Sequence, residues 1–413
     1  MIYPRFLADV LRQRRNFYPV VLLVGPRQSG KTTLTKKLGA ELGIGYSSFD
    51  DLNNLISAQM DPIGYLNTLN KPVILDEVQR APEIFLPIKV DVDNNRIPGR
   101  YMLTGSANPL VVPKLGDALT GRMTLCTMWP LSQGEIVGIR GTFLDDIFTE
   151  TSWAQKYTLL DQETLIKMLF IGGFPSLNNT TDEQYRRNWC NDYISLSLQK
   201  DINDLSKIEG LAHLPALLHG LAARVGSTHN LEALACITKT AGTTVRRYIQ
   251  LIESLFLLYR LPAWGRSIDK RLVKSSKIYF SDTALLLHVL NLNAQQLQST
   301  PDLLGHIFEN FVVMECVKQA TWSKQSPMLS HYRQEGGKGT EVDIVLESFG
   351  KTVGIEIKLS SVIRADDVKG LKSLKDLVGD AFYQGIVLYM GDKVLSLGEK
   401  LYAIPVSALW EKI

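Results

Sequence analysis

A glycine-rich stretch at residues 25–33, GPRQSGKTT, constrains the fold more than any other part of the chain. It follows an apolar run at residues 20–24 and precedes a segment of helical character at residues 32–42. A glycine-rich turn between a strand and a helix, closed by Gly-Lys-Thr, points backbone N–H groups inward and forms an anion site with the helix N-terminus. We therefore expect an α/β domain with a parallel sheet and a phosphate-binding loop. The alternative is a glycine turn that binds no ligand.

Every residue of this stretch is a candidate for contact with the phosphates of a nucleotide. The set is Gly25, Pro26, Arg27, Gln28, Ser29, Gly30, Lys31, Thr32 and Thr33. Lys31 is expected to reach the β- and γ-phosphates, and the Thr32 hydroxyl is expected to ligate Mg²⁺.

A second apolar run, at residues 73–75, ends in two acids, Asp76 and Glu77. A strand that is apolar throughout is typical of a sheet covered on both faces. Ligands of open α/β sheets bind at the carboxyl ends of the strands, where these acids emerge. Asp76 is expected to hold Mg²⁺, directly or through water, and Glu77 to polarise a water that attacks the γ-phosphate.

Polar residues also follow the next expected strand, at residues 101–105. Ser106 or Asn108 would orient the attacking water, and the alternative is that both only cap a loop. Further along, Arg122 would sense the γ-phosphate, in its own subunit or across an interface, as an arginine finger does. The competing interpretation of Arg122 is a surface ion pair.

Length and composition limit the remaining possibilities. A chain of 413 residues is long enough for two or three domains, and a net charge of +3 does not by itself indicate a nucleic-acid binder. Its four cysteines lie far apart without a C-x-x-C pair, which argues against structural zinc and a disulfide framework. We find no apolar leader and no apolar run long enough to span a bilayer, so the sequence predicts a cytoplasmic protein with no membrane partner.

The middle of the chain contains a helix–turn–helix pattern at residues 230–258, followed by a basic segment at residues 260–279. This order is typical of a winged helix-turn-helix, whose second helix enters a major groove. The residues expected to contact nucleic acid, with DNA favoured over RNA, are Arg246, Arg247, Lys270 and Arg271. The alternative is a module that contacts protein.

The last part of the chain reads as a helix, strands, a helix and a further strand. Glu356 and Lys358 share one face of a strand, because successive side chains alternate between faces. If Asp343 ends the neighbouring strand and Glu309 approaches from the helix, the three carboxylates would hold Mg²⁺ and Lys358 would orient a water. The alternatives are a salt-bridged acid–lysine face and a nuclease-like fold that does not cut.

Two resemblances bring these motifs together. The set GPRQSGKTT, VILDEVQ, LTGSAN and LTGR resembles a branch of prokaryotic AAA-type ATPases in which a carboxy-terminal domain of unknown function follows the ATPase. It implies ATP as the nucleotide. It implies the roles given above for Lys31, Thr32, Asp76, Glu77, Asn108 and Arg122. The order of Glu309, Asp343 and Glu356-x-Lys358 resembles the PD-(D/E)XK nuclease superfamily, although Val342, and not proline, precedes Asp343.

We therefore expect three parts: an AAA-type P-loop ATPase at residues 1–150, a helical lid with a winged helix at 151–295, and a restriction-endonuclease-like α/β domain at 296–413. ATP binding and hydrolysis with Mg²⁺ would gate a last region that acts on nucleic acid. The first alternative is a nucleotide-controlled binding switch whose nuclease-like domain does not cut. A second alternative is a homo-oligomeric ring that moves along nucleic acid.

Overall fold

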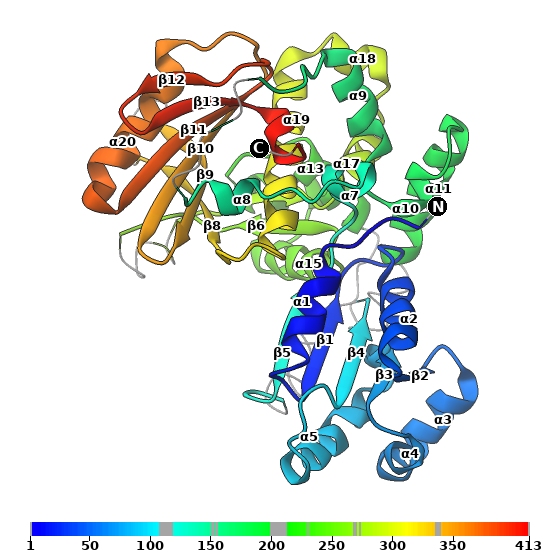
Figure 1. Cartoon of the computed structure of the whole chain (residues 1–413). Coiled ribbons are helices and arrows are strands. Elements are labelled where there is room, and N and C mark those ends of the chain that lie inside the picture. Colours follow the sequence, from blue (N-terminus) through cyan, green and yellow to red (C-terminus); the bar gives the residue numbers. More distant parts are fainter. Residues whose placement is uncertain are drawn as a thin grey trace.

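The computed structural model describes residues 2–106, 119–149, 153, 156–198, 213–228, 231–266, 271, 274–334 and 340–411. The chain forms two lobes joined at a narrow waist (Figure 1). The smaller lobe holds the first, parallel sheet, and the larger lobe holds a second sheet packed beside a group of helices. Within the described ranges, no helix is both long enough and apolar enough to cross a bilayer.

A parallel five-stranded sheet, in the order β2-β3-β4-β1-β5, forms the centre of the smaller lobe. Its strands are β1 (Val20–Val24), β2 (Gly45–Ser48), β3 (Val73–Asp76), β4 (Tyr101–Gly105) and β5 (Met123–Thr127). Val20 and Leu22 pack into one hydrophobic cluster and Val21 into another, because successive side chains point to opposite faces. The sheet is covered on both faces, as the apolar run predicts, and the lobe has the α/β fold of a P-loop NTPase.

Helices pack around this sheet and connect its strands (Figure 1). They are α1 (Leu7–Arg14), α2 (Lys31–Leu42), α3 (Leu52–Met60), α4 (Pro62–Thr68) and α5 (Phe85–Asn94). The turn from β1 into α2 is the glycine-rich stretch, so the first helix after the first strand begins at the expected anion site.

The larger lobe contains a mixed six-stranded sheet in the order β12-β13-β11-β10-β9-β8. Its strands are β8 (Met328–Arg333), β9 (Glu341–Ser348), β10 (Lys351–Lys358), β11 (Phe382–Tyr389), β12 (Leu395–Gly398) and β13 (Leu401–Pro405). One face packs against α19 (Pro301–Ala320) and the other against α20 (Lys369–Val378), in two separate hydrophobic clusters.

Strand β9 carries one extra residue relative to β8. Ser330 pairs with Val345 but Tyr332 pairs with Val342, so three steps along β9 match two along β8. Such a bulge bends a strand and changes the direction of its side chains. Asp343 lies within the bulge, and its carboxylate accepts a hydrogen bond from the backbone N–H of Ile357 in β10.

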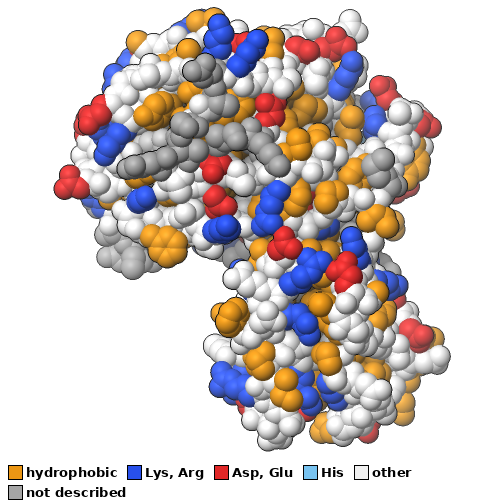
Figure 2. Space-filling model, in the orientation of Figure 1, with side chains coloured by type: hydrophobic (Ala, Val, Ile, Leu, Met, Phe, Trp, Pro, Cys, Tyr) orange, Lys and Arg blue, Asp and Glu red, His pale blue; other side chains and the backbone are white. Residues whose placement is uncertain are grey.

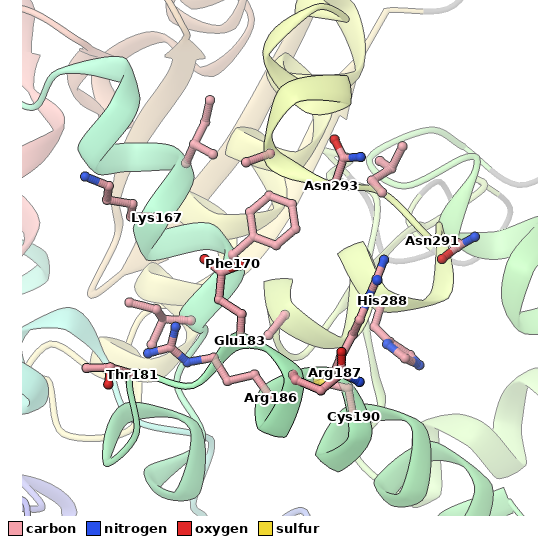
Figure 3. A pocket seen from close by; sticks show the side chains of 16 residues that line it. Lys167, Phe170, Thr181, Glu183, Arg186, Arg187, Cys190, His288, Asn291 and Asn293 are labelled. Atoms are coloured by element: carbon pink, nitrogen blue, oxygen red, sulfur yellow. The ribbon is translucent and has the colours of Figure 1, made fainter.

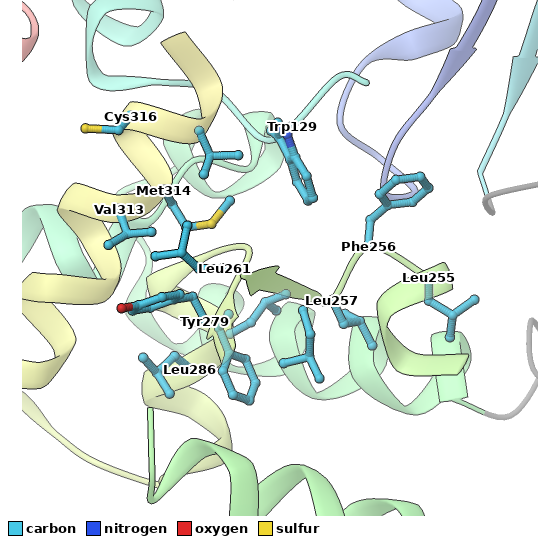
Figure 4. Packing of buried hydrophobic residues seen from close by; sticks show 14 of the residues in the cluster. Trp129, Leu255, Phe256, Leu257, Leu261, Tyr279, Leu286, Val313, Met314 and Cys316 are labelled. Atoms are coloured by element: carbon cyan, nitrogen blue, oxygen red, sulfur yellow. The ribbon is translucent and has the colours of Figure 1, made fainter. Parts of the chain in front are cut away.

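The rest of the larger lobe consists mainly of helices (Figure 1). They are α7 (Gln133–Val137), α8 (Phe143–Asp146), α9 (Gln162–Ile171), α10 (Pro175–Asn178), α11 (Glu183–Leu196), α13 (Leu214–Ala222), α14 (Leu231–Thr238), α15 (Gly242–Ser254), α17 (Thr283–Val289) and α18 (Ala294–Gln298). An antiparallel hairpin of β6 (Leu258–Leu261) and β7 (Lys277–Phe280) follows α15. Figure 4 shows how Tyr279 and Leu261 of this hairpin pack near Val313 and Met314 of α19.

The segment after β5 leaves the smaller lobe and packs on the larger one. The backbone N–H of Gln133 donates to Glu315 of α19 at 2.9 Å, and Ser323 Oγ donates to Asp145 at 2.6 Å. The side chain of Gln384 in β11 also donates to the carbonyl of Ile147 at 2.7 Å. By its contacts, therefore, this segment lies with the last sheet and not with the first.

A buried asparagine attaches β7 to α19. Asn310 is fully buried; its Oδ1 accepts from Phe280 N at 2.7 Å and its Nδ2 donates to Phe280 O at 3.0 Å. This paired contact fixes the register of β7 against the helix that carries Glu309. The Asn310 side chain thus supplies the two hydrogen-bond partners that a neighbouring strand would otherwise give to the backbone N–H and C=O of Phe280.

We predict that Asn310→Leu lowers the free energy of unfolding of the larger lobe by about 2–4 kcal/mol, since both backbone groups of Phe280 would lose their partner. Urea denaturation measures the change. As a control, Asn94→Leu replaces an exposed asparagine at the end of α5 and should change stability by less than about 0.5 kcal/mol. Equal losses in the two variants would contradict this role of Asn310.

Candidate functional site

The glycine-rich loop is tightly bent and packs against the end of β5. Gly25 has φ 152°, Gln28 φ 58° and Gly30 φ 98°, so three positions adopt conformations that favour glycine or are rare for other residues. A Cβ atom at Gly25 would lie 2.0 Å from the carbonyl oxygen of Met128. Only glycine fits at this position without moving the loop.

Lys31 is buried beneath this loop. Its Nζ donates to the carbonyl oxygens of Gly25 at 2.9 Å and Pro26 at 2.8 Å. The ammonium therefore stabilises the bend of the loop from inside, and Lys31 is also the first residue of α2. Its expected contact with the β- and γ-phosphates stays a prediction.

Thr32 and Asp76 meet at the carboxyl edge of the first sheet. Thr32 Oγ1 donates to Asp76 Oδ2 at 3.0 Å, and the Tyr46 hydroxyl donates to the same oxygen at 2.7 Å. Thr104 Oγ1 donates to the other carboxylate oxygen. Burial and the Asp76 carboxylate raise the pKa of Tyr46, so the phenol stays protonated and continues to donate. The hydroxyl and carboxylate oxygens at this edge fit the ligands that Mg²⁺ prefers.

Gln79, which the sequence analysis did not single out, links Glu77 to Ser106. Glu77 has φ 59°, and its N–H donates to Thr104 Oγ1 at 3.1 Å. Gln79 Nε2 donates both to the Glu77 carboxylate and to Ser106 Oγ, the latter at 2.8 Å. Gln79 belongs to the quoted motif VILDEVQ, which was the available signal. Asn108 lies outside the described residues.

Arg122 is not part of this site, and the expectation that it senses the phosphate in its own subunit is wrong. It immediately precedes β5, and its carbonyl accepts from Val20 N at the amino end of β1. The phosphate loop lies at the carboxyl end of β1, so the whole length of the strand separates them. The Arg122 guanidinium pairs with Asp93, which is the surface ion pair of the competing interpretation. Only a second copy of the chain could present Arg122 to a phosphate.

A cavity of about 440 Å³ adjoins the phosphate loop. Tyr3 and Phe6 from the start of the chain line it, together with Ser29, Thr33 and Leu34. The Ser29 hydroxyl is buried and makes no hydrogen bond within the described residues. A cavity beside an anion site, with two aromatic residues in its lining, is a candidate site for the base and sugar of a nucleotide.

Helix α11 of the larger lobe touches the phosphate loop directly. Trp189 Nε1 donates to Gln28 Oε1 at 3.0 Å, and the Tyr193 hydroxyl donates to Arg27 O at 3.3 Å. The Trp189 and Tyr193 rings stack with centroids 4.9 Å apart, and Phe174 packs against both. A change in the conformation of the loop would therefore alter its hydrogen bonds to α11.

The other side of α11 borders a cavity of about 530 Å³ that contains none of the predicted site residues (Figure 3). Phe170, Arg187 and His288 line it. Burial and the Arg187 charge lower the pKa of His288, so this imidazole is neutral near pH 7.

The residues expected to contact nucleic acid fall into separate places. Arg246 and Arg247 are exposed on α15, and Lys270 lies outside the described residues. Arg271 pairs with Glu347 of β9 at 2.8 Å and donates to Gly265 O, and its expected contact with nucleic acid stays a prediction. On the face drawn in Figure 2, Lys and Arg side chains are interspersed with Asp and Glu and form no single band.

In the larger lobe, the predicted carboxylates surround a lysine that sequence reasoning missed. Lys277 of β7 is 3% exposed, and its Nζ lies 2.9 Å from Glu309 Oε1, 2.5 Å from Glu341 Oε1 and 3.5 Å from Asp343 Oδ1. The Tyr279 hydroxyl, two residues along the same face of β7, also donates to Glu309 at 2.7 Å.

The two remaining predicted residues pair with each other. Lys358 Nζ donates to Glu356 Oε1 at 2.7 Å, which confirms that they share a face of β10. Asp343 Oδ2 accepts from Ile357 N at 2.9 Å, so the three residues converge at the end of the strand. Lys358 is thus bound to a carboxylate and does not stand free to orient a water.

Burial and mutual repulsion change the protonation of these groups. Burial and the nearby Asp343 raise the pKa of Glu309 to about 7, and the same two causes raise the pKa of Glu356 well above its ordinary value. Burial lowers the pKa of Lys277, but the carboxylates of Asp343, Glu309 and Glu341 outweigh it and raise the pKa overall. The lysine therefore carries its charge.

These contacts contradict the expectation that Glu309, Asp343 and Glu356 hold Mg²⁺. Within the described ranges, no group of three or more His, Cys, Asp or Glu residues is arranged to hold a metal ion. The physical reason is that the Lys277 ammonium lies between Glu309 and Asp343, while Lys358 neutralises Glu356. In this arrangement the cluster does not fit a divalent metal.

His331 provides a pH test of this buried region. Burial and the Lys277 charge lower its pKa from 6.5 to about 4. Between these values the unfolded chain binds a proton at this residue and the folded chain does not, so stability is lost as pH falls from 6.5 toward 4, by up to about 3 kcal/mol. We predict that His331→Gln removes this part of the pH dependence in urea denaturation. His306→Gln, at a half-exposed histidine, should leave it unchanged; an unchanged slope in His331→Gln would contradict the prediction.

Three families match parts of this chain. A family described as AAA domain matches residues 18–137, Domain of unknown function (DUF8612) matches 162–296, and Domain of unknown function (DUF4143) matches 304–409. Uncharacterized protein Rv2008c of Mycobacterium tuberculosis (strain ATCC 25618 / H37Rv) is 27% identical over 407 residues, which are 98% of this chain and 84% of the relative. Among solved structures, a Walker-type ATPase of Pyrococcus abyssi covers 69% of this chain and 95% of its own, with 16% identity and a TM-score of 0.40.

The match to the AAA domain spans the phosphate loop, Thr32, Asp76 and Glu77. It confirms the AAA-type part of the resemblance. The two other matches have no described function and leave the winged-helix and nuclease parts as proposals. Residues 18–137 of this chain match the AAA domain family, and the described part of the smaller lobe has the α/β fold of a P-loop NTPase.

Proposed function

We propose that this chain binds ATP with Mg²⁺ at the phosphate loop and hydrolyses it. The observation that carries the proposal is the 3.0 Å hydrogen bond between Thr32 Oγ1 and Asp76 Oδ2, at the edge of the sheet beside the loop. A hydroxyl and a carboxylate held together next to an anion site are the protein ligands that Mg²⁺ takes in P-loop proteins. When bound, the ion neutralises charge on the β- and γ-phosphates.

The surrounding residues have distinct roles in this proposal. Lys31 would exchange its two carbonyl contacts for phosphate oxygens, and the loop N–H groups would bind the rest of the triphosphate. Glu77, with Gln79 and Ser106 beside it, would orient and deprotonate the attacking water. The cavity lined by Tyr3 and Phe6 would accept the base and sugar.

Nucleotide binding would be communicated to the larger lobe through α11. A triphosphate that reshapes the loop must move Arg27 and Gln28, and these are the residues that Trp189 and Tyr193 contact. The stacked rings give α11 a rigid surface toward the loop. This contact supports a nucleotide-controlled change in the packing of the larger lobe.

For the larger lobe we propose the binding switch rather than a cutting enzyme. The pairing of Lys358 with Glu356, and of Lys277 with three carboxylates, supports a nuclease-like domain that does not cut in this arrangement. The three helices α13, α14 and α15 with the β6–β7 hairpin support a winged-helix interpretation. Arg246 and Arg247, exposed on α15, would contact nucleic acid, with DNA favoured over RNA.

Steady-state ATP hydrolysis with Mg²⁺ tests the first part of the proposal. We predict that Lys31→Ala and Glu77→Gln each lower kcat by about 10²-fold or more, because they remove phosphate binding and the general base respectively. Glu83→Gln, at an exposed glutamate in the same lobe, is the matched control and should keep the rate of the original chain. Equal rates in all four proteins would refute the ATPase assignment.

Hydrogen exchange of the backbone amides tests the communication. We predict that a non-hydrolysable ATP analogue with Mg²⁺ changes exchange in α11 and leaves α20, which is remote from the loop, unchanged. The Lys31→Ala variant should show no change in either helix. If the loop becomes protected while α11 does not respond, α11 does not transmit the nucleotide state.

A further inference from the structure

Lys277 stands where the carboxylates of two other elements converge. Lysine is almost never fully buried unless it is paired, and here one ammonium serves three acids. Glu309 comes from α19, and Glu341 and Asp343 come from β9. One carboxylate oxygen of each acid lies 2.5–3.5 Å from Nζ, so a single ammonium contacts all three acids.

The cation and its ligands belong to different parts of the chain. Lys277 lies in β7, within the region that matches DUF8612 at 162–296, whereas the acids lie within the DUF4143 match at 304–409. A neighbouring turn closes over the same contact: Gly226 N donates to Ile278 O, and a Cβ at Gly226 would lie 3.2 Å from the Glu309 carboxylate. The hairpin and this turn together cover the cluster.

We propose that the Lys277 ammonium is the built-in cation of the Glu309–Glu341–Asp343 cluster, and that this ammonium and a divalent metal ion exclude one another there. Removing the ammonium, or withdrawing β7, would convert the cluster into a site for Mg²⁺ or Mn²⁺.

Charge balance supports this exclusion. Three carboxylates around one ammonium carry an excess of negative charge, and a divalent ion would balance it better than a single positive charge does. Desolvation opposes leaving the acids without a cation, so the ammonium and the metal compete for one position.

The proposal makes β7 the element that controls metal access. Metal binding and docking of the hairpin would be linked, so each would weaken the other by the same factor. None of these residues touches the phosphate loop, so the inference goes beyond the ATPase and does not depend on it.

The test is a Mn²⁺ titration of the full chain followed by electron paramagnetic resonance, which counts free Mn²⁺. Lys277→Met should bind one Mn²⁺ at least about tenfold more tightly than the original chain, because the competing cation is gone. The double variant Lys277→Met/Asp343→Asn should lose the gain. Lys277→Arg should not gain a site, because it keeps a cation. Adding Lys31→Ala should leave all of these results unchanged, which separates this test from the ATPase.

Lys318→Met is the matched control, since Lys318 is also buried and paired, with Glu315 at 2.8 Å, but lies outside the cluster. It should bind no additional Mn²⁺. A folded Lys277→Met protein without a gain, or an equal gain in Lys318→Met, would overturn the proposal.

If Lys277→Met fails to fold, the original chain decides the question. Rising Mn²⁺ should then accelerate amide exchange in β7, and Asp343→Asn should abolish that acceleration. No response of β7 to Mn²⁺ would overturn the proposal.

Discussion

The buried carboxylate of Asp76 is the interaction on which the nucleotide-facing edge depends. It accepts hydrogen bonds from three hydroxyls, those of Thr32, Tyr46 and Thr104. These residues come from α2, β2 and β4, so one acid ties three elements to the end of β3. A parallel sheet can do this because the carboxyl ends of its strands meet at one edge. Glu77 directly follows Asp76 and its N–H donates to Thr104 Oγ1, so the same arrangement also positions Glu77.

In the larger lobe a second buried charge, that of Lys277, joins β7 to α19 and β9 through its three carboxylate partners. The two sites are joined by continuous packing: α11 touches the loop, α17 packs against α11, and β7 leads into α17. At the junction Asp282 is buried; it accepts from Ala284 N and also from Gly173 N at 2.6 Å. Asp282 therefore fastens the start of α17 to the segment that precedes α11, and a shift of α11 would act on the strand that carries Lys277.

Much of the first site could be predicted because its signals are local. A strand, a glycine turn and a helix occupy consecutive residues, and Asp76 directly follows its own strand. Arg122 was misplaced because the strand after it was not recognised. Once β5 pairs in parallel with β1, a residue that precedes β5 must lie at the edge away from the loop. No short motif announces that geometry.

The second site shows where local signals end. The spacing of Glu356 and Lys358 was sufficient to place both on one face. Lys277 gave no comparable signal, because its partners Glu309 and Asp343 follow it by 32 and 66 residues and meet it only after the hairpin docks on α19. A lysine in a basic segment is expected to be exposed, and only the tertiary packing shows that Lys277 is buried. The same packing brings Arg271 to Glu347 of β9.

Isothermal titration calorimetry with a non-hydrolysable ATP analogue tests the central claim most directly. The account predicts one site per chain, with an affinity that falls when Mg²⁺ is chelated. Asp76→Asn should lower the affinity in the presence of Mg²⁺ and have little further effect once Mg²⁺ is chelated. Folded protein that takes up no nucleoside triphosphate, or that binds one with the same affinity irrespective of Mg²⁺ and Asp76, would contradict it.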